Sequence, residues 1–92
     1  GDVIYWYFGH EGSLYDQTLS FANTIAAATG YPLDADYQAL DPAGYKDWAI
    51  LSQGIPSLTI EVGTGDTPVS PDQFETIWEE NQFVWEEMLK TL

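Results

Sequence analysis

The amino-acid sequence predicts an α/β fold whose elements follow in the order strand, helix, loop, strand, helix. Short apolar runs over residues 3–8 and 55–62 suit strands that are covered on both faces, and apolar residues recur at helical spacing over 13–28 and 70–92. Glycine and proline fall between these segments, as they do in loops. Because two strands rarely make a stable sheet by themselves, we expect the 92 residues to form one flank of a larger sheet.

The first strand is predicted over residues 3–8, because every side chain there is β-branched or aromatic and Gly9 follows. The first helix is predicted from Ser13, a candidate cap, to about Ala28, with Gly30 as its C-terminal stop. One face of this helix is apolar enough to meet a core: Leu14, Thr18, Ala22, Ile25 and Ala26.

The second half begins with an irregular stretch over residues 31–53, which contains a turn at 41–44 and a short helical turn at 45–50. The second strand is predicted over 55–62, with Pro56 near its start, where a missing N–H is tolerated.

The last helix has the clearest start signals in the sequence. Ser70 is the expected N-cap, Pro71 takes the first helical position, and Gln73 completes a capping box. The expected apolar stripe consists of Phe74, Ile77, Trp78, Trp85, Met88 and Leu92. The expected solvent face consists of Glu75, Glu79, Glu80, Glu86 and Glu87.

Composition excludes several classes of function. Fifteen acidic residues stand against two basic ones, Lys46 and Lys90, so the formal net charge is −13. Nucleic acids and anionic membranes are therefore excluded as partners, because phosphates are bound by lysine and arginine. Cysteine is absent, which excludes disulfides and thiolate metal sites, and no apolar run is long enough to span a membrane.

Glu61 is the most informative single residue. It closes the second apolar run and precedes the Gly-rich loop at 63–66, a position where an α/β enzyme commonly presents a working side chain. The alternative is that Glu61 simply turns toward solvent as the strand ends. Spacing alone leaves both interpretations open.

Standard catalytic and metal motifs are absent. His10 is the only histidine, so histidines cannot supply the three protein ligands of a catalytic zinc. An oxygen site for a hard cation at Asp34, Asp36 and Asp41 is conceivable, but the spacing matches no standard calcium loop. No serine lies in a nucleophile elbow, and nothing selects a pair of acids for glycoside hydrolysis.

Three stretches resemble the C-terminal part of zinc carboxypeptidases of the carboxypeptidase A type. They are residues 4–6 (Ile-Tyr-Trp), 45–48 (Tyr-Lys-Asp-Trp) and 54–63, the segment that ends in Glu61, Val62 and Gly63. The similarity is strongest to the bacterial branch that cleaves γ-D-glutamyl bonds to diaminopimelate in peptidoglycan peptides. It implies that residues 1–92 are the C-terminal portion of a carboxypeptidase catalytic domain, a flank of its mixed-sheet α/β/α, phosphorylase/hydrolase-like fold.

The resemblance also implies roles for four residues. Glu61 matches the family's general base, which acts on zinc-bound water. Tyr37 resembles the mobile tyrosine that folds over substrate, although a plain packing tyrosine remains the alternative. Lys46 falls near the specificity position, where a cation would suit the extra carboxylate of diaminopimelate, unless it simply faces solvent. Asp47 would shape the pocket.

On this interpretation the zinc ligands of the parent protein lie upstream, and the fragment itself holds no cofactor and is inactive alone. The substrate would be a peptide or peptidoglycan stem peptide, and the bacterial parent would be secreted or in the cell envelope. The rival interpretation is a non-enzymatic acidic module that binds a basic partner or a metal, or that oligomerises. Open strand edges would also permit self-association.

Overall fold

The computed structural model describes residues 1–6, 13–34 and 44–91, and it confirms the mixed α/β class. None of the helices within these ranges is long and apolar enough to cross a membrane. The elements, in chain order, are β1 (Val3–Tyr5), α1 (Ser13–Thr29), α2 (Tyr45–Gln53), β2 (Thr59–Glu61), the 3₁₀ turn η1 (Pro71–Gln73), α3 (Phe74–Asn81) and α4 (Val84–Lys90).

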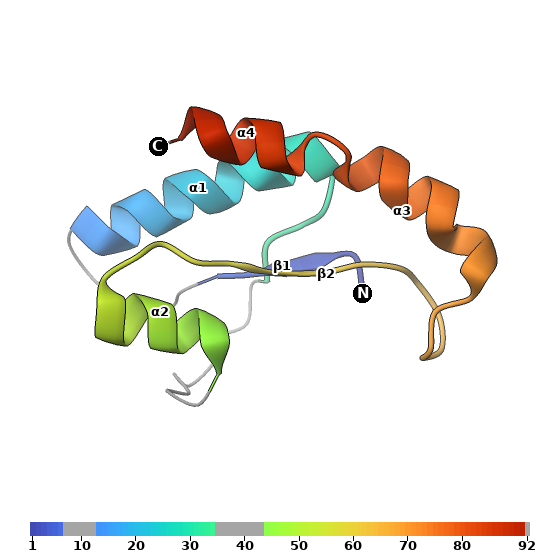
Figure 1. Ribbon diagram of the computed structural model, residues 1–92, viewed down its shortest axis with the longest axis horizontal. Coiled ribbons are helices and arrows are strands. Elements are labelled where there is room, and N and C mark those ends of the chain that lie inside the picture. The colour runs from blue at the N-terminus through green and yellow to red at the C-terminus, as the bar shows by residue number, and fades with distance from the viewer. Residues whose placement is uncertain (7–12, 35–43, 92) are drawn as a thin grey trace.

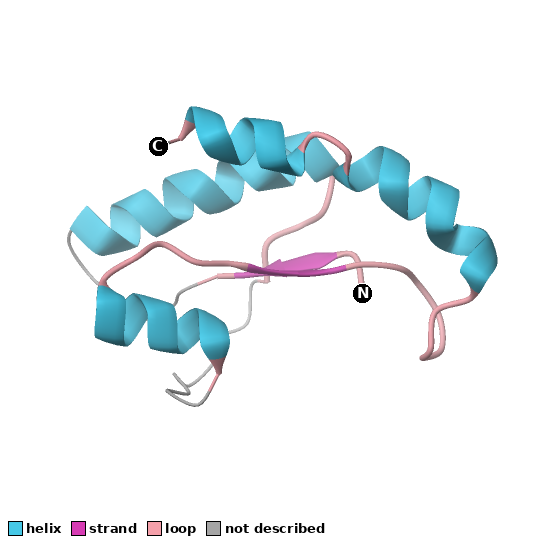
Figure 2. Ribbon diagram, viewed as in Figure 1, coloured by secondary structure: helices cyan, strands magenta, loops and turns pink. Residues whose placement is uncertain are grey.

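These elements form three layers. The two strands lie in the middle, with α1, α3 and α4 on one side and α2 on the other (Figure 1). Helix α1 packs against both α3 and α4. Residues 54–58 lead from the end of α2 into β2, and residues 62–70 lead from β2 to η1 (Figure 2).

Strand β1 lies between two other extended segments. It pairs antiparallel with β2, with Ile4 opposite Ile60. On its other edge the Ile4 N–H donates to the Pro32 carbonyl at 2.9 Å, and the Asp34 N–H donates to the Ile4 carbonyl at 2.9 Å. The predicted central position of the first strand is therefore correct, although both strands are shorter than expected: residues 55–58 lie outside the ladder. The expectation that the second run is covered on both faces is wrong, because Thr59 and Glu61 are exposed and only Ile60 is partly buried.

The core lies between the sheet and the helices above it. Ile4, Ile25 and Tyr31 are buried there, and the next layer of apolar side chains includes Phe21, Leu33, Leu58, Ile60, Val84 and Met88. The predicted inner face of α1 is confirmed, because Thr18, Ala22 and Ile25 are all buried. The left-handed Gly30, with φ 78°, follows the helix as expected, and its N–H donates to the Ala26 carbonyl at 2.8 Å.

The C-terminal region differs from the single capped helix that the sequence predicts. It consists of η1, α3 and α4, with an interruption at residues 82–83. Pro71 does take the first helical position, but the Ser70 side chain caps nothing, and the expected capping box is wrong. The amide of Gln73 instead bonds to the backbone of Thr64.

The expected apolar stripe of this region is also wrong in part. Ile77 and Met88 are partly buried, whereas Phe74, Trp78 and Trp85 are more than half exposed. Phe74 and Trp78 lie in the same helix as Ile77, so their exposure shows that the expected stripe does not coincide with the side of α3 that packs on the rest of the chain. Leu92, the last residue of the expected stripe, lies outside the described residues.

Candidate functional site

Glu61 is the last residue of β2 and lies on the sheet face that points away from α1 and α4. The preceding Ile60 packs on the core beneath those helices, and successive side chains of a strand point to opposite faces. Glu61 is exposed, and no residue that the structure describes donates a hydrogen bond to its carboxylate. An exposed carboxylate at a strand end suits a working base and equally suits a simple solvent-facing residue.

Two side chains hold the backbone that follows Glu61. The Gly63 N–H donates to Oδ1 of Asp2 at 2.8 Å. The Thr64 N–H donates to Oε1 of Gln73 at 2.9 Å, and Nε2 of Gln73 donates to the Thr64 carbonyl at 2.9 Å. These contacts, which we call the Asp2 and Gln73 clamps, restrict the exit of β2 and thus the position of Glu61.

Gly63 itself is required by the local geometry. Its φ of 87° lies in the left-handed region, and a Cβ placed there would lie 2.8 Å from Cγ1 of Val69. The chain can therefore turn this closely after β2 only with glycine at this position.

Lys46 and Asp47 lie together in the first turn of α2. Nζ of Lys46 donates to Oδ1 of Asp47, and the two side chains are only 16% and 12% exposed. The burial of Asp47 agrees with a supporting role. The ammonium of Lys46 is already neutralised, so it would have to leave or share Asp47 to meet a substrate carboxylate.

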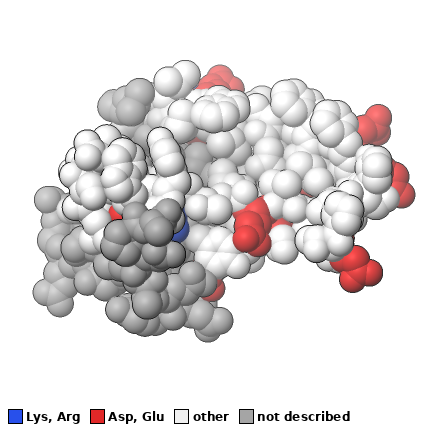
Figure 3. Space-filling view, turned by 60° about the horizontal axis from the view of Figure 1, so that its bottom comes forward, with Lys and Arg blue, Asp and Glu red and all other residues white. Residues whose placement is uncertain are grey.

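The structure places three of the four predicted site residues. Tyr37 lies outside the described residues, as do His10, Asp36 and Asp41. No hydrogen bond or ion pair joins Glu61 to Lys46. Among the described residues on the face in Figure 3, uncharged side chains predominate, with separate acidic patches and part of one lysine visible beside the undescribed region.

The described part of the chain does not fit a zinc site. It contains no group of three or more histidine, cysteine, aspartate or glutamate side chains arranged to hold a metal ion. A catalytic zinc normally takes three protein ligands. Any zinc used by the complete protein would need ligands outside residues 1–6, 13–34 and 44–91.

One buried polar network was not predicted. The Tyr31 hydroxyl donates to Oε1 of Glu80 at 3.0 Å and accepts from Nδ2 of Asn81 at 2.9 Å. Burial raises the pKa of Tyr31 to about 12, and the bond to Glu80 acts in the same direction. The expectation that Glu80 faces water is therefore wrong. Nothing in the sequence pattern around Glu80 indicates a partner as distant as Tyr31.

Comparison with known proteins gives one informative match. The chain is similar to γ-D-glutamyl-L-diamino acid endopeptidase 1 of Lysinibacillus sphaericus, with 36% identity over 81 residues. The match covers 87% of this chain; because only a few residues lie outside it, it includes Glu61. It covers 19% of the relative. The chain thus spans about a fifth of the length of this peptidase. No protein-family profile and no solved structure matches the chain.

Proposed function

We propose that this chain is part of a peptidase and that Glu61 is its general base. The observation that carries the proposal is the exposed Glu61 carboxylate at the end of a strand whose exit is held by the Asp2 and Gln73 clamps. The similarity to an endopeptidase over nearly the whole chain supports the same class of reaction. A general base must be held within reach of the proton it removes, and a clamped strand end provides such a support.

In the proposed reaction the Glu61 carboxylate takes a proton from the water that attacks the scissile carbonyl. It then returns this proton to the leaving amine, which completes hydrolysis of the amide. We include a zinc ion in the proposal for the complete protein, where it would polarise the carbonyl and activate water. Because the described residues do not fit a zinc site, its ligands would be supplied by the rest of that protein.

The proposed substrates are peptides with a γ-D-glutamyl link to a diamino acid, as in peptidoglycan stem peptides. Such substrates agree with the name of the Lysinibacillus relative. In the absence of substrate, Asp47 would hold the Lys46 ammonium in place. When substrate binds, the Lys46 ammonium would leave Asp47 and pair with the additional carboxylate of the diamino acid. Tyr37 would cover the bound substrate.

The test of Glu61 requires the complete protein that carries this chain. We expect Glu61→Gln to lower kcat by about 100-fold or more, which is the usual contribution of a general base, with a small change in KM. The measurement is the release of diaminopimelate from a γ-D-glutamyl-diaminopimelate peptide.

The matched control is Asp66→Asn, which removes another exposed carboxylate from the loop that follows β2. We expect this variant to keep nearly normal turnover. If Glu61→Gln also turned over normally, Glu61 would not be the base, and its exposure would be that of an ordinary strand end.

A further inference from the structure

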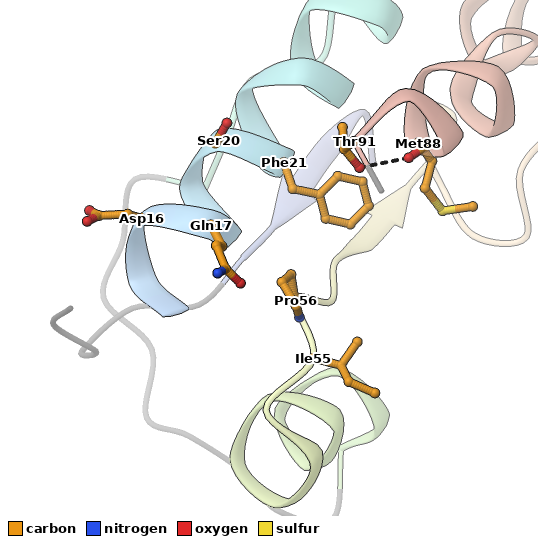
Figure 4. A pocket seen from close by; sticks show the side chains of 8 residues that line it. All are labelled: Asp16, Gln17, Ser20, Phe21, Ile55, Pro56, Met88 and Thr91. Atoms are coloured by element: carbon orange, nitrogen blue, oxygen red, sulfur yellow. Dashed lines mark hydrogen bonds between the residues drawn. The ribbon is translucent and has the colours of Figure 1, made fainter. Parts of the chain in front are cut away.

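Strand β2 has a cavity at each end. An open groove of about 800 Å³ lies where the chain enters β2, and its apolar lining includes Phe21, Pro56 and Met88 (Figure 4). A smaller cavity of about 360 Å³ lies where the chain leaves β2, and its lining includes the polar side chains of Asp2, Asp72 and Gln73. Because Glu61 ends β2, the side chains that can influence its position are those at the exit.

The hydrogen-bond pattern of the sheet shows which residue of β1 holds Glu61. The Ile4 N–H and carbonyl both bond to residues 32–34, so they point away from β2. Bonded and non-bonded pairs alternate along an antiparallel ladder, and Ile4 opposite Ile60 is therefore a non-bonded pair. It follows that Val3, which lies opposite Glu61, forms the bonded pair with it.

Beyond Glu61 a side chain replaces the backbone ladder. If the pairing continued, the next bonded pair would join Gly1 to Gly63. Instead, the Gly63 N–H donates to Oδ1 of Asp2 at 2.8 Å. Asp2 has a left-handed backbone, with φ 54°, which turns its peptide groups out of the ladder. The Asp2 carboxylate therefore restrains β2 at the position two residues after Glu61.

The segment that carries Asp2 is closely fitted to the exit of β2. A Cβ on Gly1 would overlap the Gly63 carbonyl oxygen, so the two backbones are in direct contact. The left-handed conformation of Asp2 costs energy in any residue other than glycine, although aspartate tolerates it better than most. Backbone strain of this kind persists where the surrounding structure imposes it, and it concentrates at functional sites. Here the strain lies beside the strand end that carries Glu61.

We infer that Asp2 is a positioning residue for Glu61, an inference that rests on the proposed function of Glu61 as a general base. By holding the Gly63 amide, Asp2 fixes the backbone just beyond the base and thereby the direction in which the Glu61 carboxylate meets the attacking water. Asp2 acts through the backbone and touches neither the substrate nor the reacting atoms. The hydrogen bond carries this effect, whereas the charge of Asp2 and its backbone angle do not.

Two substitutions in the complete protein separate the hydrogen bond from the backbone angle. Asp2→Asn keeps a side-chain oxygen that accepts from Gly63 and tolerates the left-handed conformation, but it removes the charge. Asp2→Gly adopts the same conformation without strain but has no acceptor. We expect Asp2→Gly to lower kcat about tenfold with KM within about twofold, because a misplaced base slows the reaction without weakening binding. Asp2→Asn should keep kcat within about threefold of the unaltered protein, because it retains the acceptor.

The matched control is Asp72→Ala, which removes another carboxylate from the exit cavity but lies in η1, outside the β1–β2 ladder. This variant should keep both kcat and KM nearly unchanged. A second measurement follows the hydrogen bond without reference to activity. Exchange of the Gly63 amide hydrogen should become faster in Asp2→Gly and remain slow in Asp2→Asn and Asp72→Ala.

A double substitution tests whether Asp2 acts through Glu61. Once Glu61→Gln has removed the base, adding Asp2→Gly should lower the residual kcat by less than about twofold. A tenfold loss in both backgrounds would overturn the inference, as would a loss in Asp2→Asn equal to that in Asp2→Gly. Normal turnover of Asp2→Gly beside an inactive Glu61→Gln would also overturn it and leave the proposed function standing. Normal turnover of Glu61→Gln is the separate result that would remove the proposed function and the inference together.

Discussion

Tyr31 is the residue that links the end of α1 to the C-terminal helices. It is 3% exposed, and its hydroxyl reaches both Glu80 and Asn81 of α3. Asn81 also donates to the Ile77 carbonyl at 3.0 Å, so the amide is held by its own helix while it serves Tyr31. A buried phenol of this kind is stable in its neutral form, which is why burial raises its pKa to about 12.

This raised pKa predicts a loss of stability in alkaline solution. The unfolded phenol ionises near pH 10 and the folded one near pH 12, so the contribution of Tyr31 is complete below pH 10 and decreases as the pH rises toward 12. The decrease should reach about 2 kcal/mol by pH 11.5. Urea unfolding between pH 8 and 11.5 measures it.

The control for this prediction is Tyr31→Phe. This variant should be less stable at neutral pH, because Glu80 and Asn81 lose a partner, yet its stability should fall less steeply above pH 10. Equal slopes for the two proteins would show that other groups cause the alkaline loss.

Gln73 offers a second prediction at the scale of single residues. Gln73→Ala removes both bonds of its clamp on Thr64, and we expect it to lower the free energy of unfolding by about 1 kcal/mol. Exchange of the Thr64 amide hydrogen should also become faster. Gln82→Ala is the matched control, because Gln82 makes a single exposed bond to the Glu79 carbonyl. A larger effect from Gln82→Ala would contradict the importance of the clamp.

At the scale of elements, the loop after β2 depends on glycine for two different reasons. Gly63 and Gly65 both have left-handed backbones, with φ values of 87° and 83°. A Cβ at Gly63 would also meet Val69 at 2.8 Å, whereas a Cβ at Gly65 would meet nothing within 4 Å. The two positions therefore separate the cost of the backbone angle from the cost of the contact.

We expect Gly65→Ala to destabilise the chain by about 1 kcal/mol, from the backbone angle alone. Gly63→Ala should cost more, about 2–4 kcal/mol, because overpacking against Val69 adds to the strain. Chemical denaturation of both variants measures the difference. If they were equally stable, the loop would be able to move away from Val69 without cost.

The sequence predicts helices and strands more reliably than their ends. Periodicity correctly places α1, because its inner side chains repeat over many turns and Gly30 ends it. Periodicity cannot show the interruption at residues 82–83, because the residues before it, in α3, and after it, in α4, are all helical. The capping signature at Ser70 and Gln73 fails because the Gln73 amide has a better partner in Thr64, which only the folded chain brings near.

At the scale of the whole molecule, the mixed α/β class and the positions of β1, α1 and β2 could be predicted, but the nine-residue helix α2, expected only as a short helical turn, the division of the last helix and the sheet pairing could not. Antiparallel pairing of β1 and β2 joins segments far apart in sequence, and no local signal specifies it. The candidate site shows the same division. Glu61 and Asp47 stand out in the sequence, whereas the clamp from Asp2 depends on bringing the N-terminus beside Gly63.

The central place of β1 also determines how the chain can fold. The backbone of Ile4 pairs with residues 32–34 on one edge and with β2 on the other, and both partners are distant in sequence, so neither pairing can form by local contacts alone. Closing such distant pairs costs chain entropy before any contact compensates for it, which slows folding. During synthesis, the first strand stays unpaired on its β2 edge until Glu61 has left the ribosome, and α1 lacks the α3 and α4 contacts that cover it until the end of the chain emerges.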